Sequence, residues 1–174
     1  MLQSACTPDG LSAIYSEHVN LAEWRRDFSG SVRHYAASVV QELPAFSLLQ
    51  VLQANVDSES LLAQLPRLDG NNEQARHDFA TDLSLLCEMY ACLFDVDQIG
   101  LRLSVLNRAM CPRFHVDHVV CRMICTYLGP GTEWLPEAQV NRNAFDQPSG
   151  SADKCHNETS IQRLGEGSVA LLKG

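Results

Sequence analysis

The densest group of chemically reactive side chains lies between residues 111 and 134. Seven residues in this span could bind a metal ion or transfer a proton: Cys111, His115, Asp117, His118, Cys121, Cys125 and Glu133. No other span of this length is as rich in such groups. If the chain performs chemistry, we expect that chemistry here.

His115 and Asp117 are two residues apart, which is the repeat of a β-strand. Side chains at positions i and i+2 of a strand point to the same face, so an imidazole nitrogen and a carboxylate oxygen could reach one metal ion. One more histidine from a distant strand would complete a 2-His-1-carboxylate site, which leaves coordination positions open on iron(II). Nearby Arg122, Tyr127 and Trp134 are candidates for binding a substrate.

Zinc offers a different interpretation of the same region. Cys111 and His115 are four residues apart, and Cys155 and His156 form a second pair further along the chain. Two thiolates and two imidazoles suit tetrahedral zinc better than iron. The adjacent Cys155-His156 pair is awkward for this role, because neighbouring side chains diverge.

A third possibility is nucleophilic catalysis by Cys111, with His115 or His118 as the base and Asp117 orienting the ring. No helix N-terminus precedes Cys111 to stabilise a thiolate, which disfavours this interpretation.

The elements that must position these residues change type near residue 100. Apolar residues at three- and four-residue spacing predict a long helix over residues 72–95, capped by Asn71 or Asn72. Pro44 should end an earlier helix near Glu42. In the N-terminal half we also expect no regular structure over 1–16, weak helical character over 17–28, a helix over 32–52 broken by Pro44, and a short helix over 57–65 capped by Asp57 or Ser58. In the C-terminal half we expect strands over 101–106, 119–128, 161–164 and 168–172. A type II turn at 129–131, with positive φ at Gly131, and a polar loop over 138–154 should connect these strands.

This order predicts an α+β fold that forms one structural unit. A helical N-terminal region, residues 1–98, is expected to pack on a β-rich, jelly-roll-like region, residues 99–174. Because the chain reaches Gly174 within an apolar strand-like run, we expect the natural protein to continue beyond this residue.

Composition limits the environment and the partners. The net charge is −8, and the basic residues are scattered, which argues against nucleic acid as a partner. No apolar stretch approaches the roughly 18 residues of a membrane span, and the N-terminus lacks the features of a signal peptide. We therefore expect a cytoplasmic protein, with its seven cysteines mostly reduced and no role for a membrane.

The stretch CPRFHVDHVVCRMICTYLGPGTEWLPE and the later IQRLGEGSVALLKG resemble a bacterial family known as domain of unknown function 1826. The resemblance covers roughly residues 75–174, with GPGTEW as its most specific part. Members of this family look like proteins often encoded beside zinc-homeostasis genes.

More distantly, the order of HxD, strand, turn, polar loop and Gly-x-Val-x-Leu-Leu strand is similar to the double-stranded β-helix of 2-oxoglutarate/iron(II) oxygenases. That resemblance implies metal ligation by His115 and Asp117, and it places a further histidine and a basic residue after Val169–Leu172, beyond Gly174.

Three hypotheses follow from these observations. The first is an oxygenase-like protein that uses iron(II) and 2-oxoglutarate, with His115 and Asp117 on the metal and an unspecified small-molecule or protein substrate. The second is a non-catalytic zinc-binding or zinc-homeostasis protein that uses Cys111, His115, Cys155 and His156. The third is a degenerate β-helix that serves as an interaction module.

Overall fold

The computed structural model describes residues 1–69, 73–111, 113–141 and 160–174. The chain divides into two compact units, and each is described by itself. The terminal unit consists of Met1–Asp27 and Cys111–Gly174, and the central unit consists of Phe28–Met110.

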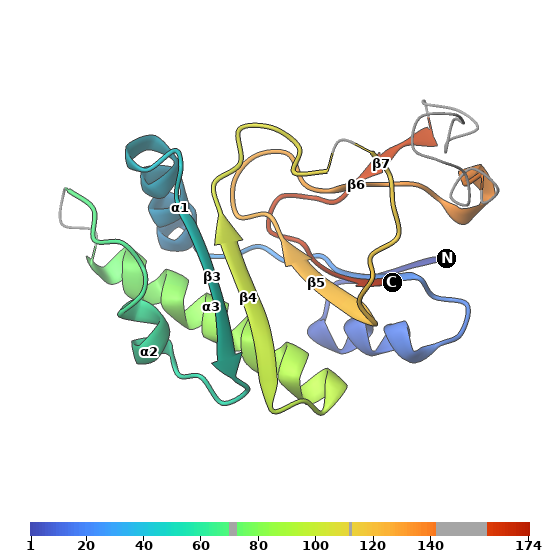
Figure 1. Ribbon diagram of the computed structural model, residues 1–174, viewed down its shortest axis with the longest axis horizontal. Helices are drawn as coiled ribbons and strands as arrows, with labels where there is room; N and C mark the ends of the chain where they lie inside the picture. Colours follow the sequence, from blue (N-terminus) through green and yellow to red (C-terminus); the bar gives the residue numbers. More distant parts are fainter. Residues whose placement is uncertain (70–72, 112, 142–159) are drawn as a thin grey trace. The chain divides into compact units, whose positions relative to one another are not determined.

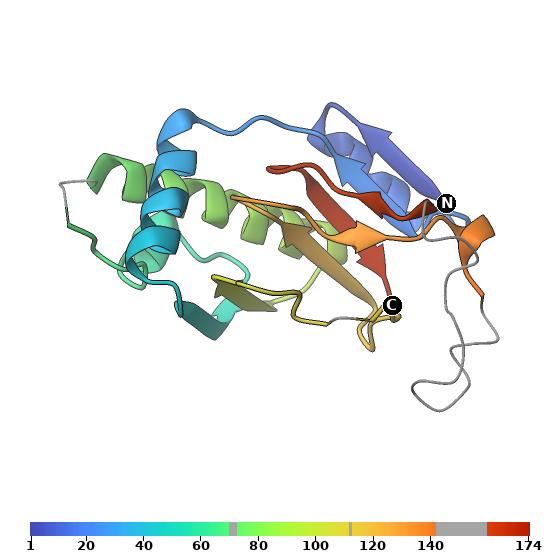
Figure 2. The ribbon, with the colours of Figure 1, turned by 90° about the horizontal axis from the view of Figure 1, so that it is seen from above.

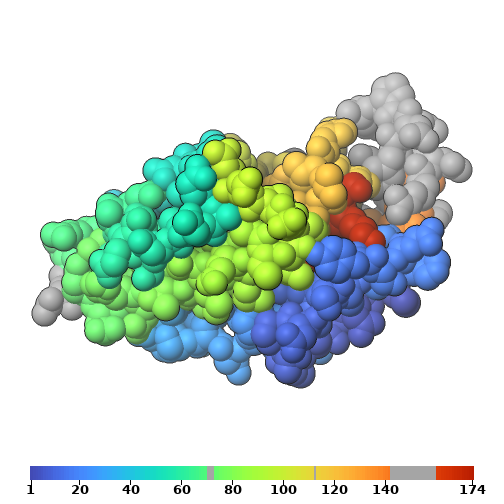
Figure 3. Space-filling model, turned by 90° about the horizontal axis from the view of Figure 1, so that it is seen from below, coloured from blue at the N-terminus to red at the C-terminus, as the bar shows by residue number. Residues whose placement is uncertain are grey.

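A four-stranded sheet with the order β1-β2-β8-β5 organises the terminal unit (Figures 1 and 2). β1 (Leu2–Ala5) runs parallel to β2 (Leu21–Trp24), whereas β8 (Val169–Lys173) runs antiparallel to both β2 and β5 (Cys121–Cys125). The two ends of the chain therefore lie side by side, as the adjoining blue and red atoms in Figure 3 also show.

The strand β8 is the centre of this sheet. Val169, Ala170 and Leu171 are all 0 % exposed, because β8 has a neighbouring strand on each side and both of its faces are covered. A continuous apolar run is the pattern expected of a strand buried on both faces. The strand predicted over 168–172 is confirmed here.

The parallel strands β1 and β2 are joined by the 3-10 helix η1 (Pro8–Tyr15). Pro8 suits the start of this helix, where its missing N–H leaves no bond unmade. Leu11 and Ile14 are three residues apart, so they share one face of a 3-10 helix, and both are buried.

One face of the sheet is covered by a short antiparallel pair. β6 (Glu133–Trp134) pairs with β7 (Gln162–Arg163), and the 3-10 helix η2 (Glu137–Gln139) follows β6. Trp134 packs against a cluster of Leu21, Leu164 and Ala170.

The central unit combines helices with a second small sheet. β3 (Ser47–Gln53) runs antiparallel to β4 (Gln98–Ser104) over the whole length of both strands. α1 (Gly30–Glu42) begins at Ser29, whose Oγ accepts a hydrogen bond from the Val32 N–H. α3 (Glu73–Phe94) packs against α1, with the ring centroids of Tyr35 and Phe79 5.1 Å apart.

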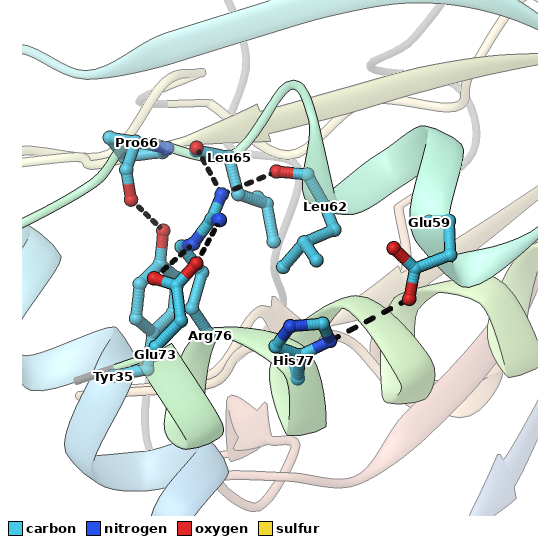
Figure 4. Close-up of polar contacts among 8 residues, drawn as sticks. All are labelled: Tyr35, Glu59, Leu62, Leu65, Pro66, Glu73, Arg76 and His77. Carbon is cyan, nitrogen blue, oxygen red and sulfur yellow. Dashed lines mark hydrogen bonds and ion pairs between the residues drawn. The ribbon is translucent and has the colours of Figure 1, made fainter.

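A buried arginine ties α2 (Ser58–Leu62) and the following loop to α3 (Figure 4). Arg76 is 4 % exposed, and its Nη1 donates hydrogen bonds to the carbonyl oxygens of Leu62 and Leu65. Nη2 of Arg76 forms an ion pair with Oε1 of Glu73, at a distance of 2.5 Å. The Tyr35 hydroxyl donates to the carbonyl oxygen of Pro66 at 2.7 Å, so the loop is held from α1 as well.

Several sequence-based expectations are wrong in detail. Residues 1–16 form β1 and η1, the helical character expected over 17–28 is replaced by strand β2, and the helix expected to resume after Pro44 is strand β3. In the turn after β5, the positive φ is at Gly129, at +90°, and not at Gly131. Gly131 is needed for space instead, because a Cβ there would lie 2.2 Å from the Leu164 carbonyl oxygen.

The mixed class of fold is confirmed. The described part of the chain contains three α-helices, two 3-10 helices and three small sheets. These sheets do not close into a barrel, and a jelly roll is not confirmed. Among the described residues, no helix has both the length and the apolar character needed to cross a membrane. The predicted caps Asn71 and Asn72 and almost all of the predicted loop over 138–154 lie outside the described residues.

Candidate functional site

His115 and Asp117 lie in an irregular segment that leads into β5. The strand geometry that we expected to align them is absent, since residues 114–117 have no regular secondary structure. The segment is instead fixed by a close approach of the end of β8. The Gly174 N–H donates to the Val120 carbonyl oxygen, and a Cβ on Gly174 would lie 1.8 Å from the carbonyl oxygen of Val119 and 2.5 Å from that of Asp117.

The side chains of His115 and Asp117, the two predicted metal ligands, nevertheless lie in contact. Nε2 of His115 lies 3.3 Å from Oδ1 of Asp117, and Nδ1 of the same imidazole lies 3.0 Å from the carbonyl oxygen of Arg113. Oδ2 of Asp117 accepts from Nε of Arg122 at 2.7 Å. Asp117 is the most buried of the three side chains, at 18 % exposure, whereas His115 and Arg122 are about half exposed.

Oδ1 of Asp117 therefore faces the imidazole of His115, and Oδ2 is bound to Arg122 on β5. A carboxylate held in this way accepts a charge-assisted hydrogen bond from Arg122 that fixes its rotation. The cluster can therefore present one nitrogen and one oxygen donor to the same point in space.

No third ligand joins this pair among the described residues. The described ranges contain no group of three or more His, Cys, Asp or Glu side chains that could hold a metal ion. Cys111 is exposed and does not complete such a group, and the same holds for His118 and Glu133. The other two predicted zinc ligands, Cys155 and His156, lie outside the described residues.

The remaining candidates are spread over the terminal unit. Arg122 contacts Asp117, as described, while Tyr127 is buried and Trp134 is half-buried on β6. Glu133 forms an ion pair with its cross-strand neighbour Arg163. Cys121 is buried, and this burial raises the pKa of its thiol.

A cavity of about 440 Å³ in the terminal unit was not anticipated from the sequence. It is lined by residues around the end of β2, including Glu23 and Arg25, and by residues of β6 and β7, including Trp134 and Arg163. A possible signal was Glu23, an acidic residue directly after the apolar Leu21 and Ala22 and followed by Arg25 and Arg26. The cavity was not predicted because residues 17–28 were expected to be weakly helical, and a helix would not place Glu23 and Arg25 beside β8 and β7.

Comparisons with known proteins place the chain in a family without a known activity. Neither the curated proteins nor the solved structures contain a match to this chain. A family model described as "Protein of unknown function (DUF1826)" matches residues 5–174, which extends the resemblance noted in the sequence toward the N-terminus. Because this match covers nearly the whole chain, the protein belongs to the DUF1826 family.

Proposed function

We propose that the protein binds a divalent metal ion between His115 and Asp117. The observation that supports this proposal is the 3.3 Å separation of Nε2 of His115 and Oδ1 of Asp117. The other nitrogen of this imidazole and the other oxygen of this carboxylate each contact a further group, which fixes both side chains. Arg113 holds the imidazole through its carbonyl oxygen, and Arg122 holds the carboxylate.

The proton on the imidazole supports a cation between the two groups. A carbonyl oxygen only accepts hydrogen bonds, so the 3.0 Å contact between Nδ1 of His115 and the Arg113 carbonyl favours the tautomer with its hydrogen on Nδ1. In the neutral imidazole, Nε2 then carries a lone pair directed at a carboxylate oxygen, and two lone pairs repel each other. A positive charge between Nε2 and Oδ1, either a proton or a metal ion, removes this repulsion.

The donor set and the spacing suit a metal ion. Metal–nitrogen and metal–oxygen bonds are about 2.0–2.2 Å long, so two ligands at a right angle on one ion are roughly 3 Å apart. The hydrogen bond from Nδ1 to a backbone carbonyl is the usual support of a metal-binding histidine. Arg122 plays the corresponding role for Asp117, because it occupies Oδ2 and leaves Oδ1 for the ion.

Iron(II) is the ion that we propose, because an imidazole and a carboxylate are two parts of the 2-His-1-carboxylate set. Bound iron(II), with 2-oxoglutarate as co-substrate, would supply the activation of oxygen for oxidising a substrate. In this oxygenase-like function, His115 and Asp117 hold the ion and Arg122 positions Asp117. Zinc held with cysteine thiolates is the alternative, and its proposed ligands are Cys111, His115, Cys155 and His156.

A purely structural role is the competing interpretation, and the same geometry allows it. If a proton lies between Nε2 and Oδ1, then His115, Asp117 and Arg122 form an ion-pair cluster that holds the segment before β5. Such a cluster has no requirement for metal, so metal content separates the two interpretations.

The test compares wild type with His115→Ala, Asp117→Ala and His118→Ala. His118 is exposed in the same segment and is a matched control, because it takes no part in the cluster. Each protein is purified anaerobically without an affinity metal, its metal content is measured by mass spectrometry, and its cobalt(II) complex is examined by absorption spectroscopy. Circular dichroism confirms that the variants fold.

Stoichiometric iron that is lost in His115→Ala and Asp117→Ala but retained in His118→Ala would support the proposal. A 2-oxoglutarate turnover assay would follow that result. Zinc in the purified protein, together with a thiolate-to-cobalt charge-transfer band in its cobalt(II) complex, would contradict iron(II) and indicate cysteine ligands. No metal in any of the four proteins would leave only the ion-pair cluster.

A further inference from the structure

A second site lies in the terminal unit, apart from His115, Asp117 and Arg122. None of these three residues lines the cavity of about 440 Å³ noted above, which we call the arginine cavity and define by Leu2, Glu23, Arg25, Trp134, Arg163 and Ser168. Its volume falls in the range of small-molecule sites, about 300–1,000 Å³. Its lining combines charged groups with an aromatic wall.

Glu23 anchors the polar side of this cavity. Its side chain is only 6 % exposed, and its Oε2 accepts hydrogen bonds from Oγ of Ser4 at 2.9 Å and from Nε of Arg25 at 3.1 Å. A buried carboxylate with two donors is already compensated. Glu23 therefore serves to hold Arg25 in place rather than to attract a cationic ligand.

Arg25 and Arg163 present unused hydrogen-bond donors to the cavity. Arg25 contacts Glu23 through Nε, so its two terminal nitrogens have no partner among the described residues. Arg163 contacts Glu133 through Nη2, and within the described ranges its Nε and Nη1 are also without a partner. Both side chains are more than half exposed, so they can reach a ligand that enters from solvent.

Trp134 supplies an apolar wall beside these donors. Its ring is half-buried and packs on the cluster of Leu21, Leu164 and Ala170, which fixes its position. A fixed indole face beside guanidinium groups suits a flat ligand that carries a carboxylate, because guanidinium binds carboxylate with paired hydrogen bonds.

The charge of the lining favours a singly charged anion. Among the described residues that line the cavity, three are arginines, Arg25, Arg26 and Arg163, and two are acids, Glu23 and Asp27, which gives these residues a net charge of +1. A dianion would leave one negative charge uncompensated next to Glu23 and Asp27. A cation would meet two exposed guanidinium groups.

We propose that the arginine cavity binds a small aromatic monocarboxylate. The carboxylate lies on Arg25 and Arg163, and the ring lies against Trp134. This site is independent of the proposed metal site and does not require a metal ion.

The test uses benzoate as the compound, with inorganic phosphate and benzylamine as controls for a dianion and a cation. Binding to chelator-treated wild type, Arg163→Gln and Arg108→Gln is measured by titration calorimetry. Arg108 is an exposed arginine of the central unit and controls for the loss of one positive charge. In parallel, the indole N–H signals of Trp24 and Trp134 are followed by NMR, with Trp134→Phe used to assign them.

We expect saturable binding of benzoate, a shift of the Trp134 signal, and an affinity about tenfold weaker in Arg163→Gln, which loses a charge-assisted hydrogen bond to the carboxylate. A tenfold change corresponds to about 1.4 kcal/mol. Arg108→Gln should bind as wild type does. The proposal would be overturned by phosphate or benzylamine binding as tightly as benzoate, by no binding of benzoate, or by equal affinity in Arg163→Gln. The same titration on His115→Ala should be unchanged, so the result does not depend on the metal proposal.

Discussion

Nη1 of Arg76 on α3 lies 2.6 Å from the carbonyl oxygen of Leu62, the last residue of α2. The Leu62 and Leu65 carbonyls lie where a helix has ended, and such carbonyls need a donor from elsewhere. Arg76 supplies it to both, and its positive charge is balanced by Glu73.

Replacement of Arg76 by methionine should therefore destabilise the protein. Both carbonyl groups would be left buried without a donor, at a cost of roughly 3 kcal/mol in the free energy of unfolding. Chemical denaturation monitored by circular dichroism measures this change. Arg67→Met is the control, because Arg67 is an exposed arginine in the same loop, and it should change the stability little. A loss in Arg76→Met no larger than in the control would contradict the proposed role.

Acid should weaken the central unit through three carboxylates. The pKa of Asp57 is lowered by hydrogen bonds from Ser60, that of Glu73 by Arg76, and that of Asp78 by Ser31 and then Gln74. Because folding lowers these pKa values, the stabilisation is present above the unfolded pKa of about 4 and is lost as the pH falls through the folded values. The melting temperature should therefore fall below about pH 4.

The contribution of one carboxylate can be separated from general acid denaturation. Asp78→Asn keeps an oxygen that can accept from Ser31 on α1 but cannot titrate. Its melting temperature should be lower than that of wild type at pH 7 and should approach it as the pH falls. Parallel melting curves across the whole pH range would show that Asp78 carries no such linkage.

Thiol labelling should distinguish two cysteines of the same helix. Cys87 and Cys92 both lie on α3, but Cys87 is buried and Cys92 is exposed. Burial raises the pKa of the Cys87 thiol to about 11, from an ordinary value near 9. At neutral pH the thiolate fraction of Cys87 is therefore on the order of a hundredfold smaller than that of an ordinary thiol. Iodoacetamide labelling near neutral pH, followed by peptide mass spectrometry, should modify Cys92 well before Cys87. Equal rates in the folded protein would show that α3 opens or packs differently.

Gly131→Ala should disturb the pairing of β6 with β7. An added methyl group would meet the Leu164 carbonyl oxygen at 2.2 Å, and the backbone must move to relieve that contact. We expect a loss of about 1–3 kcal/mol in unfolding free energy and weaker binding in the arginine cavity, which Trp134 and Leu164 line. Gly100→Ala on β4 is the matched control, since no atom lies within 4 Å of a Cβ placed there. If both substitutions have the same effect, crowding at Gly131 is not the cause.

The helices of the central unit could be predicted because their signals are local. α1 ends at Glu42, directly before Leu43 and Pro44, and Asp57 caps α2 by accepting from the Ser60 N–H at 2.7 Å. The long helix α3, Glu73–Phe94, fills the described part of its predicted range, 72–95, except for the last residue, and residue 72 lies outside the described residues. In each case a proline, a capping side chain or a repeated apolar spacing within the segment carries the information.

The strand β2 could not be predicted because its signal is not local. Val19, Leu21 and Trp24 fit a helical spacing as well as a strand, and Leu21–Trp24 is a strand because β1 and β8 flank it. The residues of β8 that pair with it are almost 150 positions away in the chain. For the same reason the sequence named His115, Asp117 and Trp134 as candidates but did not reveal that Arg25 and Arg163 line one cavity.

The position of β8 between β2 and β5 also determines the order in which the molecule can assemble during synthesis. The central unit is one continuous segment, so all of its partners are available once Met110 has left the ribosome. The four-stranded sheet of the terminal unit forms later, because β8, which lies between β2 and β5, is the last of its strands to be synthesised. Until then β1 and β2 can pair only with each other. Contacts between distant parts of a chain form slowly, so a nascent chain paused before Val169 should expose the apolar residues of β2 to chaperones.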